Sequence, residues 1–201
     1  MAENATNSRA TKSRHQILDA FARWLTERAY DELTVQDVLD RAQVGRTTFY
    51  GHFRSKEELL RCSLDRLKVG LAEAGRQRQL DAGNPPLRLA FALPFIRHVA
   101  SHGAVYQSFV GRDSFVVLER YMRRMLSDLV RDDLLTTATQ QPPQAMEVAV
   151  QHVVGGLWSV VIWWVERRVA MPADELHALF ERLSLEGLDE LVGTRGSGLP
   201  R

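Results

Sequence analysis

The stretch GRTTFYGHF, residues 45–53, carries side chains that could contact nucleic acid. Arginine can hold guanine O6 and N7 with two hydrogen bonds, and threonine can offer a hydroxyl or a methyl group to a base edge. Tyrosine and histidine can donate to phosphate oxygens, which position a protein on a duplex without reading its sequence. The candidate residues of this stretch are therefore Arg46, Thr47, Tyr50 and His52.

A helix that begins at Gly45 would separate these side chains from an apolar face. Phe49 and Phe53 are four residues apart, so they share one side of a helix, and we expect that side to be core. The candidate polar residues lie on other sides, where a partner could meet them. An ordinary surface helix packed by its aromatic side chains would show the same spacing, and this alternative stays open.

Basic charge is concentrated around this stretch, although the whole chain has a formal net charge of only +1. Residues 41–56 contain no acid and four basic residues, Arg41, Arg46, Arg54 and Lys56. Acids precede them, at Glu27, Asp31, Glu32, Asp37 and Asp40. Lys56 also stands at an expected helix start, where backbone N–H groups favour an anion. A local basic face is typical of nucleic-acid binding.

The elements that position these residues are predicted to be helices, since strand patterns are nearly absent. Apolar spacing predicts a first helix that a Ser13–Gln16 capping box could begin. A short second helix should run from its N-cap Thr34, with Asp37 at N3, to near Ala42. After a turn at residues 43–45 comes the GRTTFYGHF helix, and Ser55 with Glu58 should cap a fourth helix. Two short helices joined by a tight turn make a helix-turn-helix, whose second helix lies in the major groove.

The run LTVQDVLDRAQVGRTTFYGHFRSKEELL, residues 33–60, resembles the DNA-binding head of the tetracycline-repressor (TetR) family of bacterial regulators. The family pattern has a T-V-x-x-[IV]-[AL] second helix, an A-G-V-S turn, T-[FL]-Y-x-[HY]-F and a following K-E-E-L. The match stays in register over about sixty residues.

The resemblance implies a fold, an activity and a set of roles. The fold would have about nine helices, with a variable C-terminal ligand-binding bundle and a homodimer built on the last two long helices. Thr34, Lys56, Tyr50 and His52 would hold phosphates. Gln36, Arg46 and Thr47 would read bases, with Gly45 and Thr48 close to the DNA backbone. Arg9, Lys12 and Arg14 could form a flexible basic arm, although a solubilising tail explains them equally well.

The sequence departs from the family pattern at three positions. Gln43 replaces the turn glycine, so a non-glycine residue would accept a positive φ. Gly45 replaces the serine N-cap, which glycine tolerates with little loss. Gly51 is expected inside the recognition helix, at a cost of ~1 kcal/mol relative to alanine.

The rest of the chain is expected to be helical too, which makes the protein all-α. The fourth helix should continue to about residue 80, and DAGNPP (81–86) should end it. Further helices are expected over 87–101, 104–111, 113–135, 143–169 and Pro172 to Val192, with QQPP (140–143) as a break and residues 193–201 frayed. We divide the chain into an arm (1–12), a DNA-binding domain (13–73, motif 34–53) and a ligand-binding and dimerisation domain (74–201).

Aromatic and methionine side chains in the second half predict a small-molecule pocket, since such pockets are mostly apolar. The candidates are Phe91, Phe95, His98, His102, Tyr106, Phe109, Tyr121, Met122, Met125 and Trp158, and a plain core is the alternative. His98 and His102 are four apart and could share a metal, but with no cysteine nearby we assign no metal and no cofactor.

The uncharged run from Val148 to Val165 is best explained as a dimer helix. Its adjacent glycines would admit a partner backbone, and the final helix adds a second apolar stripe. The predicted interface is Gly155, Gly156, Trp158, Ile162, Val165, Leu176, Leu179, Phe180 and Leu183. A core helix within one chain is the competing interpretation, and a membrane span is disfavoured by polar residues inside the run.

The sequence therefore favours a ligand-responsive repressor that binds a palindromic operator as a dimer and is released by a small apolar or aromatic effector. The alternatives are a helical-bundle metal protein or enzyme with a vestigial head, and a membrane-tethered regulator. We expect that the protein is not an enzyme, because the sequence shows no nucleophile–base pair, phosphate loop or paired carboxylates. With one cysteine, Cys62, and no visible signal peptide, the bacterial cytoplasm is the expected location.

Overall fold

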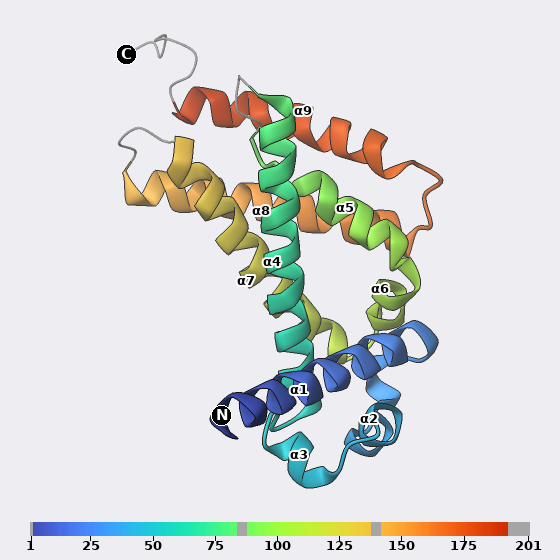
Figure 1. Cartoon of the computed structure of the whole chain (residues 1–201). Helices are drawn as coiled ribbons and strands as arrows, with labels where there is room; N and C mark the ends of the chain where they lie inside the picture. The colour runs from blue at the N-terminus through green and yellow to red at the C-terminus, as the bar shows by residue number, and fades with distance from the viewer. Residues whose placement is uncertain (1, 84–87, 138–141, 193–201) are drawn as a thin grey trace. The chain divides into compact units, whose positions relative to one another are not determined.

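The computed structural model describes residues 2–83, 88–137 and 142–192, with side chains for 10–83, 88–135 and 142–184. These residues form nine α-helices and one short 3₁₀ helix, and no strand lies among them (Figure 1). The elements are α1 (Ala2–Glu27), η1 (Tyr30–Glu32), α2 (Val35–Ala42), α3 (Arg46–Tyr50), α4 (Lys56–Ala82), α5 (Ala92–Ser101), α6 (Gly103–Phe109), α7 (Ser114–Thr137), α8 (Pro143–Glu166) and α9 (Ala173–Val192). The predicted all-α class is confirmed. The predicted breaks at 84–86 and 140–141, and the frayed end at 193–201, lie outside the described residues.

The chain divides into two compact units. A head unit comprises Met1–Leu67 and Ala104–Tyr121, and a bundle unit comprises Lys68–Gly103 and Met122–Arg201. Helices α4 and α7 each contribute to both units. The predicted division of the chain near residue 73 places residues 104–121 with the second half, whereas they pack within the head unit.

The head unit is built on α1, which packs against α2 and α3 (Figure 1). Its core includes fully buried side chains from three helices, Ile17 and Phe21 of α1, Phe49 of α3 and Leu59 of α4, together with Phe53 from the turn after α3. Helix α1 begins at Ala2, so Ser13 does not start it as predicted. The Ser13 hydroxyl instead donates to the carbonyl of Ala10 one turn earlier, at 3.0 Å. Residues 2–12 are thus continuous with α1, and the flexibility of the proposed arm stays a prediction.

Helix α2 begins and ends where its sequence predicts. The Thr34 side chain accepts from the Asp37 N–H, and the Asp37 carboxylate accepts from the Thr34 N–H, which completes a capping box. Gln43 ends the helix at φ 53° and ψ 44°, in the left-handed region that favours glycine. The predicted positive φ of this glutamine is confirmed.

Helix α3 is shorter than predicted, since it ends at Tyr50 and not at Phe53. Gly45 is its N-cap, as expected, but Gly51 is its C-cap and lies outside the helix. The His52 and Phe53 N–H groups both donate to the Phe49 carbonyl at 2.8 Å, which turns the chain toward α4. The predicted cost of about 1 kcal/mol for a glycine inside the helix therefore does not apply to Gly51.

The 3₁₀ segment η1 is held by residues far along the chain. The Tyr30 ring stacks on Phe109 of α6, with centroids 5.4 Å apart, and meets Phe21 edge-on. The Ser114 hydroxyl at the start of α7 donates to Asp31 at 2.6 Å. Burial raises the pKa of Tyr30 to about 12, so its hydroxyl stays protonated. These contacts explain why residues 104–121 belong to the head unit.

In the bundle unit, α5 packs against α8 and α9, and α8 packs against α9. The predicted start of α5 at residue 87 is wrong, because residues 88–91 form a turn in which Leu89 has a φ of 50°. Asp133 of α7 accepts from the Leu89 N–H at 3.0 Å, and Arg78 of α4 donates to the Ala90 carbonyl at 2.7 Å. The turn is thus positioned by the two helices it lies against.

Candidate nucleic-acid interface

The outer surface of α3 is polar and exposed. Arg46, Thr47, Thr48 and Tyr50 are all exposed, whereas Phe49 is completely buried beneath them. Tyr50 is 55% exposed, and its ring meets the Phe49 ring edge-on with centroids 5.3 Å apart. The predicted separation of a core face from an outward face is confirmed on this helix.

A chain of hydrogen bonds joins α3 to α2 across this surface. An Arg46 guanidinium nitrogen donates to the amide oxygen of Gln36 at 3.0 Å. The amide nitrogen of Gln36 in turn donates to a carboxylate oxygen of Asp40 at 2.8 Å. All three side chains are exposed, and two of them, Gln36 and Arg46, are predicted base readers. Sequence reasoning missed Asp40, although its i, i+4 spacing from Gln36 on one helix was a usable signal.

Thr34 is engaged by its own capping box. Its hydroxyl donates to Asp37 at 2.5 Å and accepts from the Asp37 N–H at 3.2 Å. The hydrogen bonds from Thr34 hold the pKa of Asp37 below its usual value, so the carboxylate stays charged at the start of α2. A phosphate at this helix start would have to replace the Asp37 carboxylate as the acceptor of the Thr34 hydroxyl. It would also lie beside the negative charge of Asp37. The phosphate contact of Thr34 stays a prediction.

Lys56 points into the head and not away from it. Its ammonium donates to the carbonyls of Leu33 at 3.0 Å, Tyr30 at 3.2 Å and Asp31 at 3.4 Å. It also lies 4.8 Å from the centroid of the Tyr30 ring, a cation–π arrangement. Three carbonyls occupy all three N–H donors of an ammonium. Any phosphate at this helix start would therefore meet the backbone N–H of Lys56 more readily than its side chain.

His52 contacts the first helix. Its Nε2 lies 2.8 Å from the Ser13 hydroxyl, and the neighbouring Phe53 ring lies beneath the Arg14 guanidinium at 5.3 Å. His52 is half-buried, so only part of its ring faces solvent. The residues of α1 that carry the expected basic arm are thereby joined to the turn after α3, a contact that the motif does not reveal.

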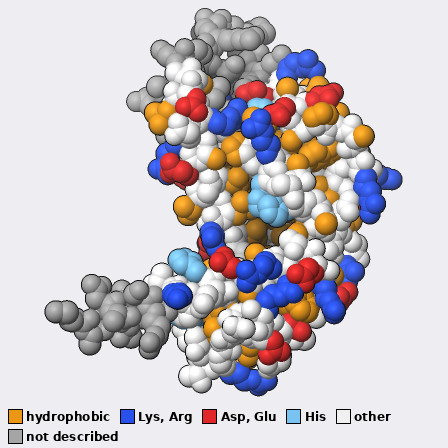
Figure 2. Space-filling model, turned by 45° about the vertical axis from the view of Figure 1, so that its right-hand side comes forward, with side chains coloured by type: hydrophobic (Ala, Val, Ile, Leu, Met, Phe, Trp, Pro, Cys, Tyr) orange, Lys and Arg blue, Asp and Glu red, His pale blue; other side chains and the backbone are white. Residues whose placement is uncertain are grey.

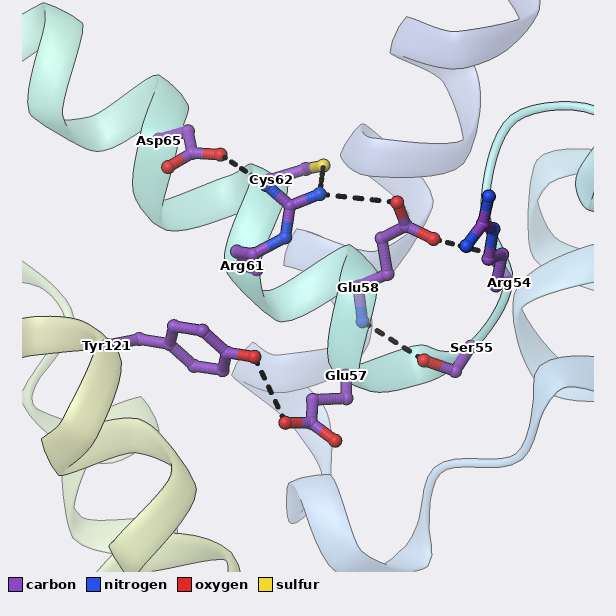
Figure 3. A network of polar contacts seen from close by, with 8 residues as sticks. All are labelled: Arg54, Ser55, Glu57, Glu58, Arg61, Cys62, Asp65 and Tyr121. Atoms are coloured by element: carbon purple, nitrogen blue, oxygen red, sulfur yellow. Dashed lines mark hydrogen bonds and ion pairs between the residues drawn. The ribbon is translucent and has the colours of Figure 1, made fainter.

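The start of α4 is a network of polar contacts (Figure 3). The Ser55 hydroxyl accepts from the Glu58 N–H at 3.2 Å, which confirms Ser55 as a cap. The Glu58 carboxylate, however, accepts from the Arg54 N–H at 2.7 Å and from Arg61, so the predicted reciprocal half of the box is shifted by one residue. Glu57 accepts from Tyr121 at 3.0 Å, which anchors the start of α7.

Not all of the basic stretch is free to meet DNA. Arg41 bonds Glu27 of α1 at 2.5 Å and lies over the Trp24 ring at 5.7 Å. The Lys56 ammonium donates to three carbonyls, as described above, whereas Arg46 gives one of its five N–H donors to Gln36. Figure 2 shows basic and acidic side chains interspersed on one face of the molecule, in keeping with the near-neutral net charge.

The residues predicted for a ligand pocket fall in both units. Phe91, Phe95, His98, His102, Met122, Met125 and Trp158 belong to the bundle unit, and Tyr106, Phe109 and Tyr121 belong to the head unit. The apolar members of the bundle set are all buried. Phe109 packs on Tyr30, and the Tyr121 hydroxyl donates to Glu57, so these two side chains have roles within the head.

The histidine pair of α5 is stacked. The ring centroids of His98 and His102 are 4.3 Å apart with an interplanar angle of 26°. His102 Nδ1 lies 2.9 Å from the His98 carbonyl and 3.0 Å from the Ser101 hydroxyl. Burial, with a contribution from His102, lowers the pKa of His98 to about 4. No group of three or more His, Cys, Asp or Glu side chains in the described part of the chain could hold a metal ion.

Four of the predicted dimer residues are core residues of a single chain. Trp158, Val165, Leu176 and Phe180 are at most 6% exposed, in a unit where α8 and α9 pack against each other and against α5. Gly156 and Leu183 are exposed, and Gly155, Ile162 and Leu179 are half-buried. The predicted interface does not include Trp163 or Val148. These α8 residues are 47% and 68% exposed. Fewer of the predicted α8 residues are therefore accessible to a partner than the sequence suggests.

Helix α8 is the one described helix long and apolar enough to cross a membrane. Half of its most apolar window is buried inside the unit, as in the core helix of a soluble protein.

The head matches a known family. Residues 17–61 match the bacterial regulatory proteins of the tetR family. This range contains η1, α2 and α3, most of the second half of α1 and the start of α4.

Solved structures share the fold over most of the chain. A TetR transcriptional regulator from Streptococcus agalactiae 2603V is 22% identical with a TM-score of 0.64, over 90% of this chain and 98% of that one. Thermus thermophilus FadR, a TetR-family transcriptional repressor in complex with lauroyl-CoA, is 21% identical with a TM-score of 0.60, over 94% and 99%. RolR in complex with resorcinol is 17% identical with a TM-score of 0.58, over 97% and 98%. At these identities the likeness shows the fold.

Proposed function

We propose that the protein is a ligand-responsive repressor that binds a palindromic operator as a homodimer, because residues 17–61 match the bacterial regulatory proteins of the tetR family. The observation that carries the proposal is the α3 surface. Four polar side chains are exposed there over a fully buried phenylalanine. A surface of this kind suits the major groove, where hydrogen-bonding side chains meet base edges.

The test is a selection of binding sites from random duplexes with the purified full-length protein. We expect enrichment of a two-fold symmetric sequence with two half-sites. Arg46→Ala should lose ~1–3 kcal/mol of discrimination at one position of each half-site. Arg23→Ala is the matched control, because Arg23 is an exposed arginine of the same head outside α2 and α3. A wild-type protein that enriches no sequence would contradict the proposal.

We place the dimer interface on the outer face of α8 and the adjoining side of α9. Its exposed and half-buried members are Val148, Gly155, Gly156, Ile162, Trp163, Leu179 and Leu183. An exposed apolar stripe beside two glycines lets two helices approach closely, and two such pairs make a four-helix bundle. Leu183→Glu should convert the dimer to a monomer in light scattering after size exclusion. Arg182→Glu, at the neighbouring exposed position, should leave it dimeric.

We propose a small apolar or aromatic effector for the bundle unit. Supporting this, the unit contains the buried side chains Phe91, Phe95, Met122, Met125 and Trp158, and methionine-rich apolar interiors adapt readily to ligands. Two proteins with the same fold bind lauroyl-CoA and resorcinol. Acyl-CoA thioesters and simple phenols are therefore the first probes to test for release of the selected operator. Release requires that the probe bind the free protein more tightly than the DNA-bound form.

The alternatives have less support. The described residues contain no three-residue metal cluster, which the metal-protein alternative would need. Half of the apolar window of α8 is buried, which disfavours a membrane-tethered regulator. We propose the cytoplasm as its location. Partition of the protein into the soluble fraction of a cell extract without detergent is the expected result.

A further inference from the structure

Asp40, which is not among the predicted base-reading residues, takes part in the hydrogen bonds that join α2 to α3. Asp40 is exposed on α2, one turn after Gln36, and accepts from the Gln36 amide nitrogen at 2.8 Å. Gln36 then presents its amide oxygen to Arg46 of α3 at 3.0 Å. We call the three residues Asp40, Gln36 and Arg46 the relay.

The direction of the relay follows from the chemistry of its ends. An ionised carboxylate can only accept hydrogen bonds, and a guanidinium can only donate them. Between the two, the Gln36 amide has one compatible orientation, with its nitrogen toward Asp40 and its oxygen toward Arg46. Both hydrogen bonds involve a charged group, and such bonds are stronger than bonds between neutral groups.

The two predicted base readers in the relay, Gln36 and Arg46, differ in how many hydrogen-bonding groups they have left for a base. A glutamine reads adenine by using its amide nitrogen and oxygen together. Each of these two groups of Gln36 makes one hydrogen bond within the relay, so Asp40 and Arg46 fix the orientation of the amide before any base is met. Arg46 has five N–H donors and uses one of them on Gln36, so it retains enough to hold guanine O6 and N7.

From this geometry we propose that Asp40 is a specificity-determining positioning residue, which holds Gln36 as a support so that Arg46 alone reads a guanine. The inference rests on the proposed function, because it concerns how that same surface discriminates bases. It differs from the family resemblance, which gives Gln36 a base-reading role of its own. Asp40 itself touches no base in this arrangement.

Two substitutions at position 40 separate positioning from charge. Asp40→Asn keeps an acceptor oxygen for the Gln36 amide but removes the negative charge. Asp40→Ala removes both, so Gln36 can turn and Arg46 loses its fixed orientation. Both variants are at an exposed position, so both should fold with unchanged melting temperature within about 2 °C.

The experiment is the random-duplex selection described above, applied to the wild type, Asp40→Asn, Asp40→Ala and Gln36→Ala. The wild type should prefer guanine at one symmetric position of each half-site. Asp40→Asn should keep this preference and bind all sites more tightly, because a negative charge near phosphates has been removed. Asp40→Ala and Gln36→Ala should each reduce the preference for guanine over adenine at that position roughly 5- to 20-fold, part of what a good bidentate contact supplies. Preferences elsewhere in the half-site should not change.

Three outcomes would overturn the inference. Asp40→Ala with an unchanged base preference would show that the acid positions nothing. Gln36→Ala that alters a different position from Arg46→Ala would show that Gln36 reads a base itself. A wild type that enriches no sequence would remove the proposed function and this inference together, whereas the first two outcomes leave the proposed function in place.

Discussion

Helices α3 and α8 both carry side chains that the sequence assigns to a partner, but they differ in how many of those side chains reach the surface. On α3, Arg46, Thr47, Thr48 and Tyr50 are exposed as predicted. On α8, Trp158 and Val165 are buried within their own chain, and the exposed tryptophan is Trp163.

The difference follows from the cost of burial. A charged or hydroxyl side chain with no partner is expensive to bury, so a polar pattern indicates a surface. An apolar side chain gains free energy equally in a core or an interface, so its pattern indicates burial without naming the location. The head shows a second difference, since several of its predicted DNA-contacting residues, among them Thr34, His52 and Lys56, already have partners within the head.

The largest expected effect is on the free energy of unfolding, and it should differ between Trp158 and Trp163 of α8. Trp158→Ala removes a side chain that is 2% exposed and should lower the free energy of unfolding by ~3–5 kcal/mol. Trp163→Ala should cost less than ~1 kcal/mol in the folded chain and weaken the dimer instead. Urea unfolding and light scattering measure the two effects. Equal losses of stability would mean that both indole rings are core, and the proposed α8 interface would lose its main aromatic contact.

Lys56 tests whether a predicted phosphate ligand is a structural residue. Lys56→Ala leaves three carbonyls of residues 30–33 without their charged donor and should lower the free energy of unfolding by ~1–3 kcal/mol. The salt dependence of DNA binding should be unchanged, because the side chain stays inside the head. Arg54→Ala, one exposed basic residue nearby, should change stability by less than ~0.5 kcal/mol.

The opposite result for Lys56 is equally informative. Unchanged stability with a salt slope lower by ~1 would show that the ammonium leaves its carbonyls to contact a phosphate.

His98 extends the comparison to a polar group of the bundle unit. Its pKa is lowered to about 4 by burial, whereas the unfolded chain should titrate near 6.5. The unfolded state therefore binds a proton first as the pH falls, and stability should decline between about pH 6.5 and 4. The loss should be ~1–2 kcal/mol after allowing for partial exposure, and His98→Gln should remove that part of the decline. Parallel unfolding curves of the two proteins across this range would show that His98 is solvated.

The smallest effect concerns the start of α3. Gly45 has φ −77° and ψ 160°, which any residue adopts, and a Cβ there would meet nothing within 4 Å. Gly45→Ser should supply the missing cap and raise the free energy of unfolding by a few tenths of a kcal/mol. Urea unfolding of paired samples measures it. A loss of stability would mean that a short helix so close to α2 is limited by packing and not by its cap.

Features that depend on neighbours in the sequence were predictable. The bounds of α2, the Thr34–Asp37 capping box, the positive φ of Gln43 and the Ser55 cap each involve residues within about one helical turn. The burial of Phe21 in α1 and of Phe49 in α3 follows from helical spacing. Phe53 is also buried as predicted, although it lies in the turn after α3. The family pattern adds the order of the helices but none of the contacts between them.

Features that depend on distant residues were not predictable. Lys56 meets carbonyls more than 20 residues away, His52 meets Ser13, and the turn before α5 is shaped by Asp133. Two further differences are local. The end of α3 at Tyr50 follows from the turn at the Phe49 carbonyl, and the continuation of α1 to Ala2 has no signal in its polar sequence.

The sequence by itself therefore determined the all-α class, the helix-turn-helix and the outward face of α3, because local hydrogen bonds and the cost of burying polar groups act at short range. Only the tertiary structure decided which apolar side chains of α8 and α9 are core, and which polar side chains of the head are engaged. Those choices depend on which surfaces meet, and residues far apart in the chain supply the surfaces.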